Sequence, residues 1–385
     1  MIGRPTITPA VQSAVPVLLL ALAAAGCGED DSPQAAPRVR HVDGHPAHEA
    51  ARRVEAAESL PDSSNTTRSI ARTPAAMTGT NEDAPAVTGR YLIVHADDVG
   101  LCDSVNRATI AALEEGVISA ASIMGPCPAF EEFADYASRH PEYDYGIHLT
   151  LNAEFQTYRW GPVLGADAVP SLVDSRGYLW AEEHQTAAHA RADDVERELT
   201  AQIERALERN IPISHLDSHM GTLFTRPDFL EIYVNLGLKY DLPILITRGG
   251  RDLSMFTTSR ELKARVDEIV ETLDKNGLPV LDHVVMHYAA DSVQQKRRYY
   301  GNAFERLPAG VSEVIVHLGY NDRSMRQVTL SPAIRDNDRQ AISDPSLAER
   351  ISRLGIRVIN WKQFRGMNAR RTTPATSLEQ TRRDQ

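Results

Sequence analysis

Acidic residues and histidines follow several of the apolar, β-branched runs in this sequence. They are Asp97 and Asp98, His148, the stretch His-Leu-Asp-Ser-His at 215–219, and His317. Such runs are typical of buried parallel strands, whose carboxyl ends meet on the face where α/β proteins build their sites. A single histidine at a strand end is more often structural, but four such clusters indicate a constellation. Because one carboxylate and two imidazoles leave coordination positions open for water and substrate, the sequence predicts a catalytic metal site.

The ligand set that we predict is Asp98, His148 and His219. Two adjacent acids favour a metal, because strand alternation sends their side chains in different directions and each would need a partner if buried. His215 is a competing ligand, since residues 215, 217 and 219 can share one face of a strand. In either case we expect Asp217 to orient a ligating imidazole from behind.

The elements that must position these residues alternate along the chain. Short β-rich runs and helical stretches succeed one another from residue 90 to residue 366, which predicts parallel strands linked by helices. In one helical stretch, apolar residues recur every four positions from Val195 to Leu207. About eight such units favour a (β/α) barrel, complete or distorted, over an open doubly wound sheet. The expected strands are Tyr91–Ala96, Ala120–Met124, Tyr145–Leu149, Ile213–Leu216, Leu242–Thr247, Val284–His287, Glu313–His317 and Arg357–Asn360.

The first of these runs carries a recognisable motif. Residues 92–101, Leu-Ile-Val-His-Ala-Asp-Asp-Val-Gly-Leu, resemble the opening motif of the YdjC-like carbohydrate deacetylases, the family that includes chitooligosaccharide deacetylase. The match continues in the same order at Gly116–Ser122, Pro128–Phe130, Gly146–Leu151, Pro170–Gly177 and His215–His219. The resemblance implies a distorted barrel of the polysaccharide-deacetylase-like type, a divalent metal, and hydrolysis of N-acetyl groups on amino sugars or oligosaccharides.

Roles for individual residues follow from the resemblance. It implies that Asp98, His148 and His219 hold the metal, which favours His219 over His215, that Asp97 is the general base, and that His317 is the acid at a strand end. In this reading Asp97 takes a proton from a metal-bound water, and His317 as imidazolium protonates the departing sugar amine. The metal is Mg²⁺ or Zn²⁺, since imidazoles favour zinc and a carboxylate with several waters suits magnesium. Aromatic residues in the long segment after His148 are candidates for stacking on sugar rings: Trp160, Tyr178 and Trp180.

Other classes of function use some of the same features. Another metal-dependent amide or ester hydrolase, or a phosphoesterase, could use the same ligands, although a phosphoesterase ordinarily wants a second metal cluster or a basic clamp. A non-catalytic sugar-binding lipoprotein would have no use for an acid, a base and a metal with open coordination positions in the same site. The net charge of −11 argues against a nucleic-acid partner. The spacing of Cys102 and Cys127 matches no zinc or redox motif; a disulfide is the alternative to two incidental small apolar residues.

The N-terminal segment predicts export and a lipid anchor. Residues 1–27 contain an apolar run, 15–25, that is too short to span a bilayer but suits the core of a signal peptide. The run ends in Leu-Ala-Ala-Ala-Gly-Cys, which resembles a bacterial lipobox with Cys27 as the lipidated residue. The alternative is a cleaved signal with an A-x-A site at Ala23 and Ala25. Residues 28–89 are expected to be a disordered tether and residues 367–385 a disordered tail. Together with the signal peptide and Cys27, this pattern predicts an exported lipoprotein that is anchored to a membrane on its periplasmic or extracellular face.

Replacement of the predicted lipidation site tests this interpretation. In Cys27→Ser the thiol that would receive the lipid is absent, so the protein should move from the membrane fraction to the soluble fraction or remain unprocessed. Fractionation of expressing cells measures this. Equal membrane retention of the wild type and the variant would contradict the assignment.

Overall fold

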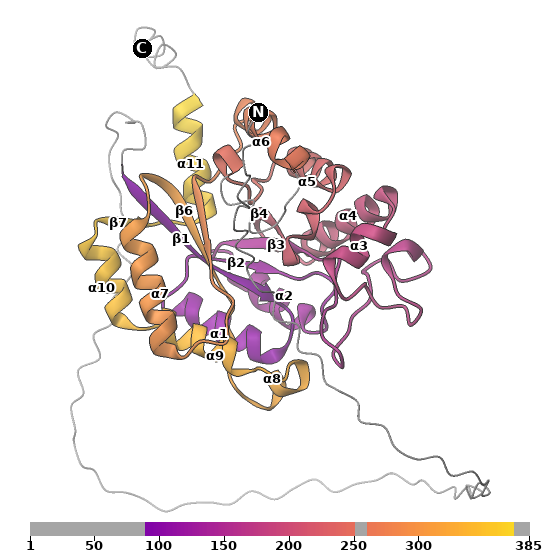
Figure 1. The fold of residues 1–385 in the computed structure, drawn as a ribbon, viewed down its shortest axis with the longest axis horizontal. Helices are drawn as coiled ribbons and strands as arrows, with labels where there is room; N and C mark the ends of the chain where they lie inside the picture. Colours follow the sequence, from indigo (N-terminus) through magenta and orange to yellow (C-terminus); the bar gives the residue numbers. More distant parts are fainter. Residues whose placement is uncertain (1–88, 251–259, 373–385) are drawn as a thin grey trace, which may run out of the picture. The chain divides into compact units, whose positions relative to one another are not determined.

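The computed structural model describes residues 89–250 and 260–372. Within this part of the chain, seven strands form one parallel sheet (Figure 1): β1 (Arg90–Val99), β2 (Ala120–Ile123), β3 (Tyr145–Leu149), β4 (Ile213–Ser218), β5 (His283–Met286), β6 (Gly310–Val316) and β7 (Ile356–Val358). They lie in the order β4-β3-β2-β1-β6-β5, and β7 pairs with the first residues of β1. The expected parallel α/β architecture is therefore present.

Helices connect the strands and surround the sheet (Figure 1). They are α1 (Asp103–Glu114), α2 (Phe130–Arg139), α3 (Glu183–His189), α4 (Ala192–Glu208), α5 (Pro227–Tyr240), α6 (Arg260–Lys275), α7 (Val293–Arg306), α8 (Arg323–Val328), α9 (Ala333–Ile342), α10 (Pro345–Arg353) and α11 (Trp361–Thr372). Along α4, the predicted apolar stripe is buried at Val195, Leu199 and Ile203, whereas Leu207 in the last turn is exposed. The stripe thus attaches the helix to the core except at its end.

β1 is the central strand of the sheet. It pairs with β6 from Arg90 to Ala96, with β7 at its start and with β2 toward its end. Every residue from Tyr91 to Val99 is buried, as expected for a parallel strand with the barrel interior on one side and helices on the other. The strand runs three residues further than the sequence predicted, so that it includes the two adjacent acids.

The barrel is distorted between β4 and β5. The segment Leu242–Thr247, predicted as a regular strand, makes only isolated parallel bridges, from Ile244 to Leu216 of β4 and from Thr247 to Leu281 before β5. Pro243 lacks a backbone N–H and contributes only its carbonyl, which accepts from Leu216 at 2.9 Å. The prediction of a strand here was wrong, but the segment still lies between the two ends of the sheet.

The barrel interior is divided into an apolar and a polar part. Where the strands begin, a cluster of buried side chains includes Ile93, Leu281, Val311 and, from the last helix, Trp361. The Trp361 ring stacks on His215 with centroids 4.9 Å apart. Beyond His215, toward the carboxyl ends of the strands, the interior is polar.

Several sequence-based expectations concern the ends of the chain. The predicted signal peptide, Cys27 and residues 28–88 lie outside the described residues, as do residues 373–385. The helix α11 extends to Thr372, so residues 367–372 are helical rather than part of a disordered tail. Among the helices of the described ranges, none combines the length and apolar character needed to cross a bilayer. Cys102 and Cys127 are buried free thiols, as expected for incidental apolar residues.

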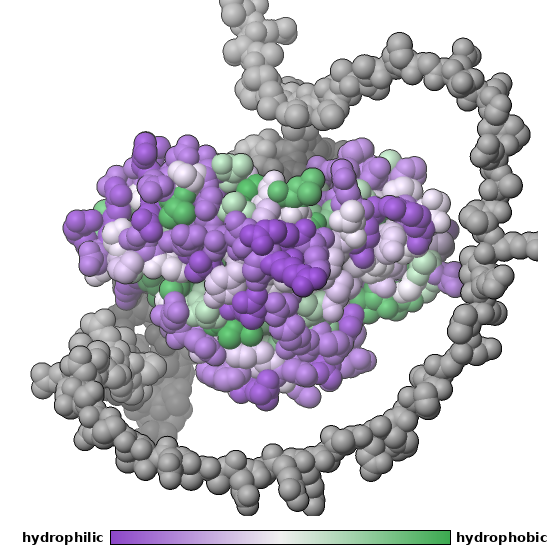
Figure 2. All heavy atoms as spheres, turned by 90° about the horizontal axis from the view of Figure 1, so that it is seen from below, coloured by the Kyte–Doolittle hydropathy of each residue, from purple (hydrophilic) through white to green (hydrophobic). Residues whose placement is uncertain are grey.

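The face of the described body that is seen in Figure 2 is mostly polar. In the view of Figure 2 hydrophilic residues predominate, and apolar residues form small separate patches. The large apolar side chains that are exposed, such as Leu330 and Leu164, are far apart in the sequence and few in number within the described ranges. Such scattered exposure is ordinary for a folded domain.

Gly146 of β3 leaves room for the His215 imidazole, and its replacement tests the polar interior. A Cβ atom at this position would lie 2.3 Å from the Nε2 atom of His215, a residue with no exposed surface. Gly146→Ala should therefore lower the free energy of unfolding by about 1–3 kcal/mol, the usual cost of overpacking a core. Gly366→Ala on α11 is the control, because that Cβ would meet nothing within 4 Å and alanine is favoured in a helix. Urea unfolding measures both; equal stability of the two variants would contradict the packing argument.

Candidate metal centre

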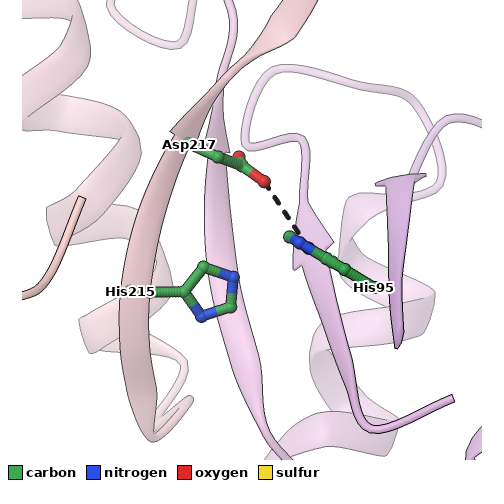
Figure 3. A group of neighbouring side chains, drawn as sticks. All are labelled: His95, His215 and Asp217. Carbon is green, nitrogen blue, oxygen red and sulfur yellow. Dashed lines mark ion pairs between the residues drawn. The ribbon is translucent and has the colours of Figure 1, made fainter. Parts of the chain in front are cut away.

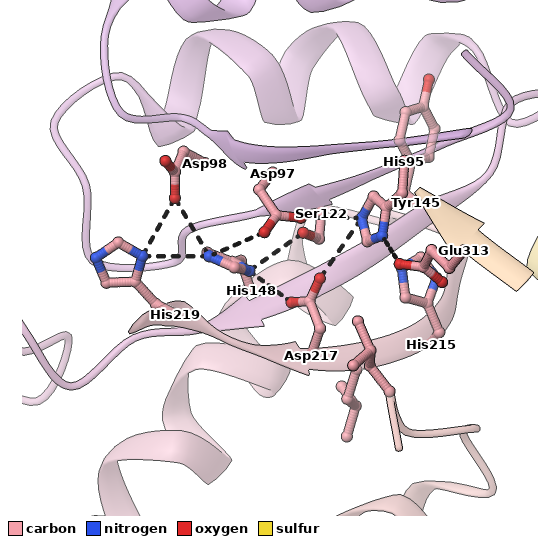
Figure 4. Close-up of polar contacts among 12 residues, drawn as sticks. His95, Asp97, Asp98, Ser122, Tyr145, His148, His215, Asp217, His219 and Glu313 are labelled. Atoms are coloured by element: carbon pink, nitrogen blue, oxygen red, sulfur yellow. Dashed lines mark hydrogen bonds and ion pairs between the residues drawn. The ribbon is translucent and has the colours of Figure 1, made fainter. Parts of the chain in front are cut away.

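The three residues predicted as metal ligands meet at the carboxyl end of the strands (Figure 4). Asp98 lies near the end of β1, His148 near the end of β3 and His219 directly after β4, and each is at most 4% exposed. Asp98 Oδ1, His148 Nε2 and His219 Nδ1 form a triangle with all three sides 3.2 Å long. With metal–ligand bonds of about 2.1 Å, neighbouring donors are about 3.0 Å apart in an octahedron and about 3.4 Å apart in a tetrahedron. The triangle therefore has the dimensions for one divalent ion.

The backbone at Asp98 turns this carboxylate into the group. Asp98 has a φ of +64°, a left-handed conformation that few residues other than glycine, asparagine and aspartate adopt readily. The turn that follows is held by the Asn106 side chain, which accepts from the Gly100 N–H at 2.8 Å and donates to the Ala129 carbonyl at 3.0 Å. As a result, Asp97 and Asp98 both point toward His148 instead of alternating across the strand (Figure 4).

Each imidazole of the triangle has a carboxylate on its other nitrogen. His148 Nδ1 lies 2.7 Å from Asp217 Oδ1, and His219 Nε2 lies 3.0 Å from Glu154 Oε2. An N–H donated to a carboxylate leaves the opposite nitrogen with its lone pair directed at the centre, which is the arrangement found around ligating histidines. The sequence led us to expect this contact for Asp217. It gave no indication of Glu154, which follows β3 in an irregular segment.

Arg335 of α9 contacts the second oxygen of the central carboxylate. Its Nη2 lies 2.6 Å from Asp98 Oδ2, and its own side chain is 2% exposed. Burial alone would raise the pKa of Asp98, but Arg335 and the two histidines hold it well below its usual range. Nε and Nη1 of Arg335 are buried and have no hydrogen-bond partner among the described residues. Arg335 was missed because nothing in the sequence distinguishes it from other arginines on helices.

Asp97, the predicted base, lies beside the triangle. Its Oδ2 is 3.9 Å from His148 Nε2, and its Oδ1 has no hydrogen-bond partner among the described residues. Burial raises the pKa of Asp97 to about 7, against the opposing effect of His148. A carboxylate with this pKa can take up a proton near neutral pH.

His317, the predicted acid, follows β6 and is held in its neutral form. Burial lowers the pKa of His317 to about 3; nearby Asp98 opposes this shift, whereas Arg335 and Lys296 add to it. The backbone N–H of His317 donates to Asp338 Oδ2 at 2.9 Å, whereas the side-chain Nδ1 has no partner among the described residues. The proposed acid role predicts an imidazolium, whereas this environment favours the neutral imidazole.

The predicted stacking residues are not gathered at the centre. Trp160 lies nearby, 6.5 Å from the His219 ring between centroids, but it is 3% exposed. Trp180 stacks on His189 at 4.4 Å, and Tyr178 has the guanidinium groups of two arginines over its ring. The aromatic ring that is exposed beside the site is Tyr288, which is 47% exposed and 4.7 Å from the His317 ring. The sequence shows where aromatic residues occur but not which of their rings are exposed beside the site.

The competing ligand, His215, lies deeper in the barrel. Its Nδ1 is 2.8 Å from Ser214 Oγ, and the ring rests on Trp361 and not beside Asp98. The alternation along β4 therefore places His215 and Asp217 in the interior, with His219 beyond the end of the strand.

Comparisons with known proteins place this chain in a family. Residues 91–353 match the family described as "YdjC-like protein". The carbohydrate deacetylase of Geobacillus stearothermophilus is 29% identical over 71% of this chain and 98% of its own length, and that of Thermoanaerobacter pseudethanolicus is 25% identical over the same shares. The crystal structure of a putative cellobiose-phosphate cleavage protein from Enterococcus faecalis has a similar fold, with a TM-score of 0.59 and 24% identity over 71% of this chain and 98% of that chain. Because the family match covers most of the chain, including all the strands except β7, this protein is a member of the YdjC-like family.

Proposed function

We propose that the protein is a metal-dependent carbohydrate deacetylase that hydrolyses the N-acetyl groups of amino sugars or oligosaccharides. The observation that carries the proposal is the triangle of Asp98, His148 and His219, in which both imidazoles are backed by carboxylates. The likeness to curated carbohydrate deacetylases over nearly their whole length supports the same chemistry.

The residues of the triangle fit a divalent ion. Asp98 Oδ1 is buried without a hydrogen-bond partner among the described residues, and both imidazole nitrogens are directed at it. An ion held there would supply a water of lowered pKa and would polarise the amide carbonyl. Two imidazoles favour Zn²⁺, whereas open positions for several waters suit Mg²⁺, and this donor set accommodates both.

The residues around the triangle would transfer protons and stabilise the negative charge that develops during hydrolysis. Asp97 takes the proton of the attacking water, because its raised pKa and its unpartnered oxygen suit a general base beside the ligands. The free N–H groups of Arg335 donate to the negative charge that develops on the acetyl oxygen. Since His317 rests neutral, we assign the proton that reaches the leaving nitrogen to protonated Asp97, and to His317 a hydrogen bond to the substrate.

Tyr288 is the proposed contact for the sugar ring. Its exposed ring lies against His317 and 5.8 Å from the Arg335 guanidinium, so a sugar stacked on it would lie next to the reacting groups.

Acetate release from N-acetylglucosamine oligomers, measured with and without a chelator, tests the proposed activity. Release that is absent under all metal conditions would overturn it.

Removal of one proposed ligand should remove both metal and activity. His219 would coordinate through Nδ1, and its Nε2 contacts Glu154. In His219→Gln the amide can still reach Glu154 but no donor replaces Nδ1, so the metal that a chelator extracts from the native protein should be lost together with acetate release. His189→Gln, a histidine stacked on Trp180, is the control. Unchanged metal content in His219→Gln would exclude this ligand.

Removal of the proposed base should spare the metal. Asp97→Asn should keep the metal that a chelator can extract and lose about 10²–10⁴-fold in the rate of acetate release, the usual contribution of a positioned base. His317→Asn should lose less, because the neutral imidazole supplies a hydrogen bond rather than a proton. Metal analysis and rates are measured on the same preparations. An equal or larger loss in His317→Asn would restore His317 as the acid, and loss of metal in Asp97→Asn would show that the two acids are assigned the wrong way round.

A further inference from the structure

A second group of possible metal donors lies deeper in the barrel than the candidate centre. His95 comes from β1, and His215 and Asp217 come from β4; their side chains face one another in the interior (Figure 3). All three are at most 1% exposed. His95 Nε2, His215 Nε2 and Asp217 Oδ2 have no hydrogen-bond partner among the described residues, and one donor atom from each lies within 4.8 Å of the others.

The hydrogen bonds around the group fix what these atoms can offer. His95 Nδ1 contacts Glu313 Oε1, which accepts the proton of that nitrogen. His215 Nδ1 lies 2.8 Å from Ser214 Oγ, whose own hydroxyl proton is donated to Asp144. The serine oxygen is thus left to accept the Nδ1–H of His215. With Nε2 unprotonated, both histidines present a lone pair to the interior beside Asp217. Burial lowers the pKa of His95, but Glu313, Asp97 and Asp217 raise it to about 9, so a proton on Nε2 is the alternative to an ion.

Without a proton on Nε2, His95 would face carboxylate oxygens with no donor between them. His95 Nε2 and Asp217 Oδ2 are 3.5 Å apart, and Asp97 Oδ1, also unpartnered, lies 3.6 Å from the same nitrogen. A buried arrangement of this kind needs a positive charge or a donor between the acceptors. Two imidazoles whose far nitrogens lead to carboxylates, with a third oxygen donor, are a typical environment for a protein-bound metal.

We propose that His95, His215 and Asp217 bind a second divalent cation, of the kind that imidazole ligands favour, such as Zn²⁺. The ion has a structural role, because Trp361 covers the group from below and no ligand is accessible to solvent. It links β1 to β4, which are separated by β2 and β3 in the sheet, and so holds the barrel together across its interior.

The proposed ion also supports the candidate centre. Asp217 would bind it through Oδ2 while Oδ1 holds His148 Nδ1 at 2.7 Å. The second ion would therefore fix the carboxylate that orients a proposed ligand of the first. The inference does not depend on the proposed deacetylase activity, because it rests only on the donors and their partners.

Counting metals in the full chain tests the proposal. The protein is purified without a metal-binding tag from zinc-supplemented cells, and its metal content is measured before and after dialysis against a chelator under native conditions. We expect two equivalents before dialysis. The chelator should remove the equivalent at the candidate centre, whereas the equivalent at the second site should be retained until the protein is unfolded.

Two variants distinguish the sites. His95→Asn places an amide donor near the position of Nδ1, toward Glu313, and removes Nε2. This variant should lack the metal equivalent that the wild type retains during dialysis and should keep the equivalent that the chelator removes. It should also melt at a lower temperature. His219→Gln should show the opposite pattern of metal content. A retained equivalent that persists unchanged in folded His95→Asn would overturn the proposal.

A measurement on the wild type decides the matter if His95→Asn does not fold. X-ray absorption at the zinc edge of the dialysed wild-type protein should show nitrogen and oxygen neighbours with an imidazole pattern and no sulfur. A wild-type protein that retains no metal after dialysis would show that a proton or a buried water satisfies the group, and that result would overturn the proposal. Neither outcome depends on acetate release, so failure here is distinct from failure of the deacetylase assignment.

Discussion

Carboxylates buried inside a barrel destabilise the fold unless positive charge or hydrogen-bond donors surround them. Four of them, Asp97, Asp98, Asp217 and Glu313, are at most 6% exposed in the polar part of this interior. His95 on Glu313, His148 on Asp217 and Arg335 on Asp98 are the groups that compensate them. The same requirement makes the site fit cations, because the compensation within the described residues is incomplete at Asp97 and Asp98.

Arg335, the buried arginine at the centre, has opposite effects on two of its neighbours. Arg335 lowers the pKa of Asp98 and thereby keeps this carboxylate ionised. Burial lowers the pKa of His317 and the same charge lowers it further, so the imidazole after β6 stays neutral. A group that makes one residue a good ligand therefore makes another a poor acid. This is the physical reason for our proposal that His317 supplies a hydrogen bond rather than a proton.

The site residues that could be predicted from the sequence are those placed by the local pattern of a strand. The apolar run before Asp97 and the alternation through His215 and Asp217 place side chains by local geometry, which a single sequence contains. Sequence reasoning failed for Glu154 and Arg335, which reach the centre from an irregular segment and from a helix far along the chain. It also failed for Leu242–Thr247, whose apolar composition suits a strand but whose proline interrupts the pairing. Those outcomes depend on tertiary contacts that no local pattern specifies.

The position of Trp361 in the chain has a consequence for how the protein is made. This ring covers the bottom of the polar interior, yet it belongs to the last helix, and β1 finds its partners β6 and β7 only among the C-terminal strands. During synthesis the barrel therefore stays open at that end until α11 has left the ribosome. A chain truncated before α11 would expose the buried carboxylates to water, and any component of the deep interior has to enter before the final helix docks.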